Sequence, residues 1–319
     1  MKKDDLKPIL KRTFPGFSED DFTGTGASFT RGKVRDIFDL GEEIVITTSD
    51  RISAFDRVLT TIPCKGEVLN RMALYWFAQT RDIIPNHIAE EVSGRTVKVK
   101  KSEVLPVEVV MRGYLTGSAW RDYQAGKPVS GISLPEGMRF NQAFEKPLLT
   151  PSTKAERGTH DEPISSEAVV VKGLVDEALW KKVEETAEKL FTRGMEIAKS
   201  RGLILVDTKY EFGVQNGRLV LVDEIHTPDS SRFWFADTYE ELFAAGEKQR
   251  KIDKEFLRQW LMEEKKFMGD GDIPDIPDDI RMEVALRYIQ AFELITGETF
   301  KPEDLSPEEE KERILRLFT

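Results

Sequence analysis

The alternation of apolar and polar residues predicts an antiparallel, mixed first third of the chain. Extended segments are expected at residues 29–40, 43–48, 96–101 and 106–111. Between them, residues 66–83 place apolar side chains such as Val68 and Met72 at helical spacing. Short strands that lie close together around one helix favour an α+β lobe over a doubly wound parallel sheet.

The rest of the chain predicts a loop, a long helix, a hairpin and a helical tail. Residues 127–164 are rich in Gly, Pro, Ser and Thr and lack sustained periodicity, which is typical of a functional loop. Residues 175–200 carry apolar side chains on one helical face, and Gly202 is placed to cap that helix. A hairpin is expected around Asn216-Gly217. The last eighty or so residues are highly charged and are expected to be helical and to cover a second lobe, although a solvated helical face would also explain them.

The composition indicates a soluble, folded protein. The 319 residues include 47 Lys plus Arg and 57 Asp plus Glu, so the formal net charge is −10. No run approaches the ~18–20 apolar residues of a spanning helix, and the N-terminus lacks the apolar core of a signal peptide. We therefore expect a cytoplasmic protein that does not bind membranes. The single cysteine, Cys64, cannot form an intrachain disulfide, and the acidity disfavours nucleic acid as a partner.

Several common catalytic motifs are absent from the sequence. Gly126-Lys127 lacks the upstream glycine of a Walker A loop, and Gly24-Thr25-Gly26 lacks the third glycine of a dinucleotide-binding motif. There is no G-x-S-x-G elbow, and the three histidines are too scattered for a zinc site. These absences disfavour a dehydrogenase, a serine hydrolase and a zinc enzyme, and each histidine is expected to be structural.

The strongest candidate chemistry lies on one strand of the expected hairpin, where Asp207, Lys209 and Glu211 alternate onto one face. The opposite face of this strand carries apolar residues. The partner strand is apolar before it ends in Asp223 and Glu224. A solvated face with an ion pair would explain such charges, but apolar strands that deliver carboxylates at their ends favour a metal or catalytic site.

The length of the hairpin loop decides which acid joins Lys209. A two-residue loop, Asn216-Gly217, places Glu224 on the face of Lys209. A three-residue loop, with Gly217 in the left-handed conformation, shifts the pairing by one residue and places Asp223 there instead. The residues alone permit both registers.

Three further segments suit the binding of phosphate. In the segment RGKVRD, residues 31–36, two cations alternate along an extended chain beside a glycine. In RGYLTGSAW, residues 112–120, a strand end passes through glycines to a helix start, with an arginine and a serine that suit a phosphate monoester. A simple helix cap would also explain this segment. In HTPDSSR, residues 226–232, short polar groups and an arginine again follow a strand.

Six segments, in their order along the chain, resemble one enzyme family. They are GKVRD, TSDRISAFD, VVMRGYLTGSAW, TPSTKAE with HDEPIS, ILVDTKYEFG and DEIHTPDSSRFW, and they lie between residues 31 and 234. The series resembles the phosphoribosylaminoimidazole-succinocarboxamide synthases, also called SAICAR synthetases, in their longer form. One such motif alone is weak, whereas six in the same order are specific.

The resemblance implies a two-lobed α/β fold of the α+β type. Residues 1–108 would form an antiparallel, β-rich ATP-binding lobe related to ATP-grasp and kinase lobes. Residues 109–319 would form an α/β substrate and metal lobe with C-terminal helices. The implied reaction joins carboxyaminoimidazole ribonucleotide (CAIR) to L-aspartate in purine synthesis, with ATP and Mg²⁺, through an acyl phosphate. Both a monomer and a homodimer remain open.

The resemblance also implies which residues bind ATP and metal. Lys33 and Arg35 would hold the ATP phosphates, with the adenine at the hinge between the lobes near Glu108. Glu211 and Asp223 would bind Mg²⁺, a hard ion that takes carboxylates, phosphate oxygens and water. This assignment selects the three-residue hairpin loop.

The remaining roles implied by the resemblance concern catalysis and substrates. Lys209 would neutralise the substrate carboxylate and the acyl phosphate. Asp207 would orient Lys209 or accept a proton from the aspartate amine. The 5′-phosphate of the ribotide is assigned to Arg112, Ser118, Ser231 and Arg232. The other assignments are Asp229 for the ribose or ring, Lys154 and Asp161 for L-aspartate, and Asp50, Ser53 and Asp56 at the border of the cleft.

Two alternatives come from other functional classes. A kinase-like phosphotransferase would share the first lobe, but it needs His-Arg-Asp and Asp-Phe-Gly motifs that the sequence lacks. A non-catalytic nucleotide-sensing module would bind ATP without turnover. This alternative assigns no function to the charged residues between positions 207 and 223.

Overall fold

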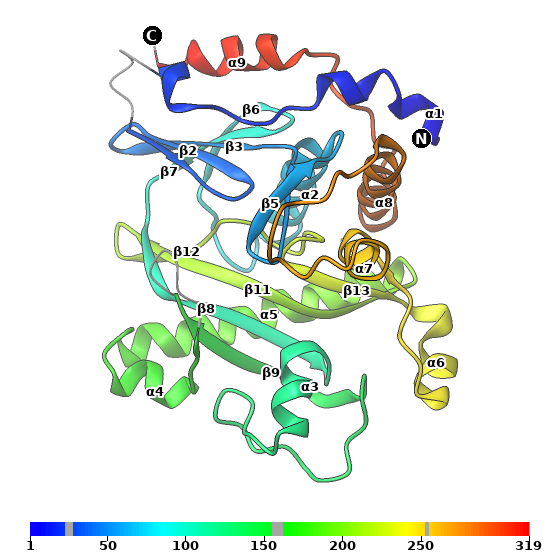
Figure 1. The fold of residues 1–319 in the computed structure, drawn as a ribbon. Coiled ribbons are helices and arrows are strands. Elements are labelled where there is room, and N and C mark those ends of the chain that lie inside the picture. Colours follow the sequence, from blue (N-terminus) through cyan, green and yellow to red (C-terminus); the bar gives the residue numbers. More distant parts are fainter. Residues whose placement is uncertain (23–27, 155–161, 253–254, 319) are drawn as a thin grey trace. The chain divides into compact units, whose positions relative to one another are not determined.

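Antiparallel sheets organise the chain (Figure 1). The computed structural model describes residues 1–22, 28–154, 162–252 and 255–318. Contacts divide the chain into two compact units. Unit 1 consists of Met1–Tyr75, His87–Lys101 and Asp253–Thr319, and unit 2 consists of Trp76–Asn86 and Ser102–Ile252.

A five-stranded antiparallel sheet forms the centre of unit 1. Its strands, in spatial order, are β1 (Ser28–Arg31), β2 (Arg35–Asp39), β3 (Glu43–Thr48), β7 (Thr96–Lys100) and β6 (Ile88–Ser93). A separate hairpin pairs β4 (Arg51–Ala54) with β5 (Arg57–Thr61). The helices of unit 1 are α1 (Lys3–Leu6), α7 (Glu255–Glu264), α8 (Asp278–Thr296) and α9 (Pro307–Leu315), with the 3-10 helices η1 (Ile9–Arg12) and η2 (Glu19–Phe22). Helix α2 (Lys65–Thr80) begins in unit 1 and ends in unit 2.

Side chains from both ends of the chain close a core in unit 1. Phe14, Phe17 and Phe38 are buried, and Phe17 meets the other two rings edge-on at centroid distances of 5.4 and 5.2 Å. Ile314 of α9 belongs to the same buried cluster. Burial of these apolar groups therefore attaches the C-terminal helix to the N-terminal segment and to the sheet of unit 1.

A larger antiparallel sheet forms the centre of unit 2 (Figure 1). Its strands, in spatial order, are β10 (Glu162–Pro163), β9 (Ala143–Thr153), β8 (Glu103–Tyr114), β11 (Leu203–Gln215), β13 (Ser231–Phe235) and β14 (Lys251–Ile252). Strand β12 (Arg218–Val222) pairs with the far end of β11. The helices of unit 2 are α3 (Gly117–Gln124), α4 (Ser166–Val171), α5 (Glu177–Ser200), η3 (Ala236–Thr238) and α6 (Tyr239–Ala245).

Helix α5 covers one face of the sheet of unit 2 and lies along β11 (Figure 1). The side chain of Asp176 caps its first turn by accepting hydrogen bonds from the backbone of Ala178 and Leu179. Gly202, with φ of +71°, follows its C-terminus as predicted. Although α5 has 24 residues, no helix in the described part of the chain is both long and apolar enough to cross a membrane.

The structure confirms some of the expected elements and corrects others. The strand at residues 43–48 and the helix that ends at Ser200 are confirmed. The expected loop over residues 127–164 is wrong in part, because Ala143–Thr153 forms β9. The burial of β9 does not alternate cleanly, so its pairing with β8 is what makes it a strand. Residues 29–40 form two strands instead of one, because the chain turns back after Arg31.

The contacts group the chain differently from the expected division at residue 108. Residues 102–108 enter β8, which runs unbroken into the sheet of unit 2. The segment from Asp253 onward groups with unit 1, whereas the charge pattern of the tail suggested the second lobe. A helical pattern shows which face of a helix is apolar, but it does not show which sheet covers that face.

Candidate functional site

Three carboxylates converge on the ammonium group of Lys209 in unit 2. The Nζ of Lys209 lies 2.9 Å from Glu108 Oε1, 2.5 Å from Glu211 Oε1 and 3.9 Å from Asp223 Oδ2. Lys154, which follows β9, places a second ammonium group on Glu211. With three negative and two positive charges, this lysine–carboxylate cluster carries one net negative charge.

Strand pairing explains how these side chains meet. Glu211 of β11 lies directly opposite Glu108 of β8. Alternate residues of a strand share a face, so Lys209 stands beside Glu211. The other face of β11 holds the buried side chains of Tyr210 and Phe212, as the sequence pattern predicted. The cluster thus stands on a sheet whose opposite face is part of the core.

The charges of this cluster reinforce one another. Burial works against the charge of Lys209, but Glu211 and Glu108 outweigh it and raise the pKa of Lys209 well above its usual value. Burial would raise the pKa of Glu211, but Lys209 and Lys154 outweigh it and lower that pKa to about 2. At neutral pH Lys209 is therefore a fixed cation, and it does not act as a general base.

The predicted three-residue hairpin loop is wrong. Gln215 pairs with Arg218, so the loop between them has two residues. Asp223 nevertheless reaches Lys209, because β12 ends at Val222 and Asp223 takes the left-handed conformation with φ of +68°. The turn of the backbone, and not the register of the strands, brings this carboxylate to the cluster. Glu224, the acid that the two-residue register favoured, accepts a hydrogen bond from Thr227.

A second polar group, the arginine cluster, stands on the same strand. Asp207 of β11 receives two hydrogen bonds from Arg232 of β13, through Nε at 2.8 Å and through Nη2. The guanidinium of Arg112 on β8 lies 3.7 Å from the same carboxylate. Arg112 also donates to Thr150 Oγ1 at 2.8 Å and to Ser118 Oγ at 3.1 Å. Asp207 therefore holds two arginines, and no described contact links it to Lys209.

Helix α3 begins against this arginine cluster. Gly117 takes a left-handed φ of +61°, and a Cβ at this position would collide with the guanidinium of Arg232. With this glycine the helix start approaches the guanidinium of Arg232 without displacing it. Ser231 Oγ lies 2.7 Å from Thr208 Oγ1, and Asp229 donates its backbone N–H to Thr227 Oγ1 at 3.3 Å. The predicted phosphate residues Arg112, Ser118, Ser231 and Arg232 thus belong to one neighbourhood.

The two clusters are separated by a defined length of strand. Asp207 and Glu211 are four residues apart on β11, or about 13 Å at ~3.3 Å per residue. The arginine cluster has two guanidinium groups and one carboxylate, so its net charge is positive, whereas the lysine–carboxylate cluster has one net negative charge. One sheet face therefore carries a net positive group at one end and a net negative group at the other.

The predicted ATP residues lie in unit 1, at the turn between β1 and β2. Gly32 donates to the carbonyl of Arg35 at 2.7 Å and so closes the turn. Lys33 stands on this turn and forms an exposed ion pair with Asp56, at 2.6 Å. Glu108, which was also expected near ATP, contacts Lys209 in the lysine–carboxylate cluster of unit 2.

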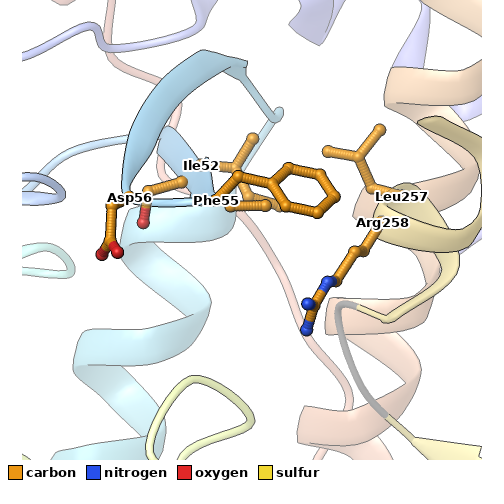
Figure 2. Close-up of a pocket in the computed structure, with 7 residues that line it drawn as sticks. Ile52, Phe55, Asp56, Leu257 and Arg258 are labelled. Atoms are coloured by element: carbon orange, nitrogen blue, oxygen red, sulfur yellow. The ribbon is translucent and has the colours of Figure 1, made fainter. Parts of the chain in front are cut away.

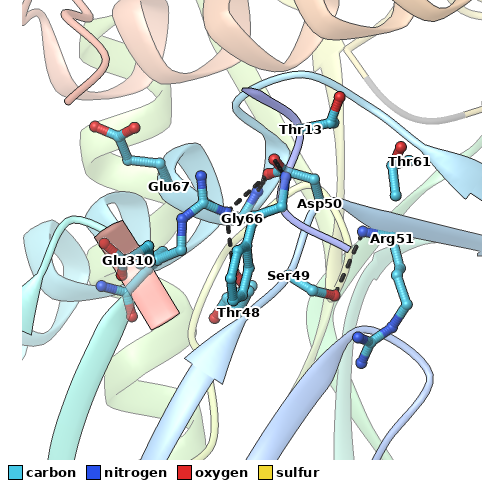
Figure 3. Close-up of polar contacts among 12 residues, drawn as sticks. Thr13, Thr48, Ser49, Asp50, Arg51, Thr61, Gly66, Glu67 and Glu310 are labelled. Carbon is cyan, nitrogen blue, oxygen red and sulfur yellow. Dashed lines mark hydrogen bonds and ion pairs between the residues drawn. The ribbon is translucent and has the colours of Figure 1, made fainter. Parts of the chain in front are cut away.

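The other predicted cleft residues have different surroundings. Asp50 is buried, and it accepts hydrogen bonds from the backbone of Phe14 and Gly66 at 2.8 Å and from Arg95 at 3.0 Å. These contacts give Asp50 a role in the fold of unit 1 (Figure 3). Asp161 lies outside the described residues.

Ser53 and Asp56 line a cavity of about 250 Å³ in unit 1, between the β4–β5 hairpin and α7. Figure 2 shows the ring of Phe55 directed toward Leu257 and Arg258, while the carboxylate of Asp56 points away from them. Phe55 and Asp56 form the hairpin turn, with φ of 53° and 59°. The guanidinium of Arg258 lies 5.1 Å from the centre of the Phe55 ring.

A buried histidine lies behind the site, and the candidate residues did not include it. His226 is fully buried, and its Nε2 lies 2.5 Å from Tyr210 Oη. The ring of Trp76 packs edge-on against it at 4.6 Å. Gly194 of α5 leaves room for the imidazole, because a Cβ there would collide with it. His226 thus anchors the turn between β12 and β13 to the back of β11, which is a structural role as expected.

This histidine predicts a loss of stability in acid. Burial lowers the pKa of His226 to about 3 from 6.5, its value in an unfolded chain. Between these values the unfolded chain binds more protons, so the free energy of unfolding falls as pH falls, by about 1.4 kcal/mol per unit. Between pH 6.5 and 4.5, urea unfolding should show a loss about 2 to 3 kcal/mol larger in the wild type than in His226→Gln. Equal pH dependence in the two proteins would contradict this assignment.

The chain is similar in sequence to one enzyme family over most of its length. A model of the SAICAR synthetase family matches residues 28–271. The chain is 46% identical over 291 residues to the phosphoribosylaminoimidazole-succinocarboxamide synthase of Legionella pneumophila (strain Paris), a match that covers 89% of this chain and 92% of that relative. It is 50% identical over 285 residues to the same enzyme of Bacteroides fragilis (strain ATCC 25285), with 88% and 90% covered.

Solved structures agree with this similarity. The SAICAR synthase of Saccharomyces cerevisiae, solved in complex with SAICAR, matches with a TM-score of 0.79 and 33% identity over 91% of this chain and 100% of that one. A SAICAR synthetase solved in complex with ADP matches with a TM-score of 0.65 and 26% identity, over 86% and 100%. The resemblance seen in the six motifs is confirmed: the chain belongs to the SAICAR synthetase family.

Proposed function

We propose that the chain joins CAIR to L-aspartate by way of an acyl phosphate, with the two clusters of β11 as its ribotide and reaction sites. ATP-dependent ligation in purine biosynthesis is the activity of the family. In the first step a carboxylate oxygen of CAIR attacks the γ-phosphorus of ATP, and ADP leaves. In the second step the neutral amine of L-aspartate attacks the acyl carbon, inorganic phosphate leaves, and the nitrogen loses a proton.

The observation that carries the proposal is the pair of clusters on one sheet face. A ribotide has a phosphate at one end and, in CAIR, a carboxylate at the other. We assign the phosphate to Arg112 and Arg232, whose planar forks suit phosphate oxygens, with Ser118 and Ser231 as further donors. Asp229 is proposed to contact the ribose or ring. The yeast relative in complex with SAICAR supports binding of a ligand of this shape.

Lys209 is proposed to stabilise the charge that develops at the reacting carboxylate. It is held as a cation by its carboxylate neighbours, and it is half-buried, where a positive charge acts more strongly than in bulk water. Because Asp207 already receives two hydrogen bonds from Arg232, we assign it to positioning the arginines and not to taking a proton.

Two carboxylates of the lysine–carboxylate cluster suit a magnesium ion. Within the ranges that the structure describes, no three His, Cys, Asp or Glu side chains are grouped so as to hold a metal alone. Mg²⁺ usually takes one or two carboxylates and completes its shell with phosphate oxygens and water. Glu211 and Asp223 both lie within 4 Å of the Lys209 ammonium group and offer hard oxygen donors. A bound ion would neutralise phosphate charge there.

The remaining assignments concern ATP and L-aspartate. Lys33 and Arg35 are proposed to hold the ATP phosphates at the β1–β2 turn, and the ADP complex of the relative supports nucleotide binding. Lys154 is proposed to bind a carboxylate of L-aspartate, since its ammonium group already forms an ion pair with the carboxylate of Glu211. Asp161 is proposed to hold the amine, and Ser53 and Asp56 to border the substrate site.

Isotope transfer tests the acyl phosphate. CAIR labelled with ¹⁸O in its carboxylate should deliver one ¹⁸O per turnover to the released phosphate, measured by mass spectrometry. Steady ADP release should require both CAIR and L-aspartate. Phosphate without the label would rule out phosphorylation of the carboxylate, and equal ADP release without L-aspartate would rule out the ligase in favour of a phosphotransferase.

A further inference from the structure

A buried arginine of unit 1 uses all five of its N–H donors, which reach the β1–β2 turn, Asp36 of β2 and the N-terminal segment. Arg51, the first residue of β4, donates through Nε to the carbonyl of Lys33 at 3.1 Å. Its Nη2 donates to the carbonyl of Gly32 at 3.1 Å and to Asp36 at 2.7 Å. Its Nη1 donates to the carbonyl of Pro15 at 2.6 Å and to Asp36 at 3.2 Å. This guanidinium therefore connects the β1–β2 turn to the N-terminal segment.

The arginine and its neighbour Ser49 hold three successive carbonyls. Arg51 binds those of Gly32 and Lys33, and Ser49 binds that of Val34 through its backbone N–H at 2.9 Å and its hydroxyl at 2.7 Å. Ser49 Oγ also lies 3.4 Å from the backbone N–H of Arg51 (Figure 3). In Figure 3 the guanidinium of Arg51 extends away from Asp50, so the two neighbouring residues serve different parts of unit 1.

The direction of the carbonyls sets the direction of the amides. In a planar trans peptide the N–H points opposite to the C=O of the same unit. Because the carbonyls of Gly32 and Lys33 point to Arg51, the N–H groups of Lys33 and Val34 point away from it. Successive N–H groups on one side of a turn form a concave site for anions. The turn therefore presents backbone donors on the side opposite Arg51.

The geometry of the turn also depends on a glycine. A Cβ on Gly32 would lie 2.8 Å from the backbone oxygen of Arg35, which is closer than real Cβ atoms approach. Gly32 and Arg51 thus act on the same short segment, one by leaving space and the other by binding carbonyls. Neither needs to touch a ligand in order to shape the turn.

We propose that Arg51 is a positioning residue for ATP, which holds the Gly32–Arg35 turn in the shape that receives the phosphates. The inference rests on the proposed function, because it takes this turn to be the phosphate site. A lysine cannot replace Arg51 in this role, because one ammonium group does not span two carbonyls and a carboxylate in the way that a planar fork does. The effect of Arg51 on the reaction is therefore specific to ATP.

The test compares Arg51→Lys with a matched variant, Arg95→Lys. Arg95 is a largely buried arginine of the same unit that pairs with Asp50 at 3.0 Å and lies over the ring of Phe14. Both variants keep a positive charge and lose a guanidinium. In Arg51→Lys the KM for ATP should rise at least tenfold, while the KM values for CAIR and L-aspartate stay within twofold. In Arg95→Lys all three KM values should stay within twofold.

Two results would overturn the proposal. One is a folded Arg51→Lys enzyme with the wild-type KM for ATP, and the other is an equal rise in Arg95→Lys. If Arg51→Lys does not fold, Asp36→Asn replaces it as the test, because it removes the charge that fixes the guanidinium of Arg51 and leaves residues 32–35 unchanged. We expect a rise of about threefold in the KM for ATP in Asp36→Asn, and an unchanged KM would equally reject the role of Arg51.

A variant within the turn tests the assignment of the ATP site independently of the role proposed for Arg51. Lys33→Met should raise the KM for ATP and weaken ADP binding measured by calorimetry. If Lys33→Met changes neither, the turn is not the phosphate site and the proposed ATP assignment is wrong. If Lys33→Met raises the KM for ATP and Arg51→Lys does not, only the role of Arg51 is wrong.

Discussion

Replacing Lys209 with methionine is expected to lower kcat about a thousandfold, the upper end of the loss caused by removing one preorganised group that stabilises transition-state charge. The side chain keeps its length and loses its ammonium group, which lies 2.9 Å from Glu108 and 2.5 Å from Glu211. Without that charge, the carboxylates repel the CAIR carboxylate and its acyl phosphate. The rate is measured as steady-state ADP release with all three substrates at saturation.

A second lysine of the chain provides the matched control for Lys209. Lys98 on β7 of unit 1 also bridges two carboxylates, Glu43 at 3.7 Å and Glu90 at 3.6 Å, and it is about as exposed. Lys98→Met should keep kcat within twofold of the wild type, because its ion pairs lie outside the proposed site. A folded Lys209→Met enzyme with near wild-type kcat would remove Lys209 from the mechanism.

The alternation of side chains along β11 was sufficient to predict which residues share a face. This inference depends only on the strand repeat, so it needed no knowledge of the neighbouring strands. The pairing of Glu211 with Glu108 was not predicted, because it depends on the register between strands about a hundred residues apart. The resemblance placed Glu108 near ATP, and that assignment stays a prediction, whereas the position of Glu108 beside Lys209 is a result of strand pairing.

The hairpin shows a different limit of sequence reasoning. The choice between its two registers assumed that the strand continues through Asp223. Pairing stops at Val222, and Asp223 then turns into the left-handed region. This conformation costs a residue other than glycine about 1 kcal/mol, and the surrounding packing has to impose it. Since no local pattern encodes that packing, Asp223 could be named as a candidate, but the way in which it reaches Lys209 could not be predicted.

Arg51 and His226 illustrate contacts that no motif shows. Each was visible in the sequence only as one letter within a longer matching segment. The partners of Arg51 include Pro15, 36 residues away, and His226 meets Tyr210 across the sheet. Both residues are buried and contact a polar segment from its inner side. Because burial depends on the whole fold, a local sequence pattern does not reveal such contacts. Sequence reasoning therefore found the residues that face the proposed ligands more readily than the buried residues that hold those ligand-facing segments in place.

Asp207→Asn is expected to raise the KM for CAIR about thirtyfold, with a much smaller change in kcat. The aspartate binds Arg232 through two hydrogen bonds and lies 3.7 Å from Arg112. An amide keeps the shape of the side chain but removes the charge, so the two guanidinium groups repel each other and lose their orientation toward the phosphate. The loss of one charge-assisted interaction, about 2 kcal/mol, corresponds to this change in affinity.

The kinetics of Asp207→Asn also separate the two roles first considered for this residue. If Asp207 accepted a proton from the aspartate amine, the amide would lower kcat and remove a group from its pH profile while the KM for CAIR stayed constant. A positioning role changes the KM for CAIR and leaves the pH profile of kcat unchanged.

Asp82→Asn is the matched control, because Asp82 binds Arg193 through both carboxylate oxygens, at 3.2 and 2.9 Å, on an exposed part of unit 2. Its kinetic constants should remain those of the wild type, so a shift confined to Asp207→Asn would identify Asp207 as the residue that holds the phosphate-binding arginines.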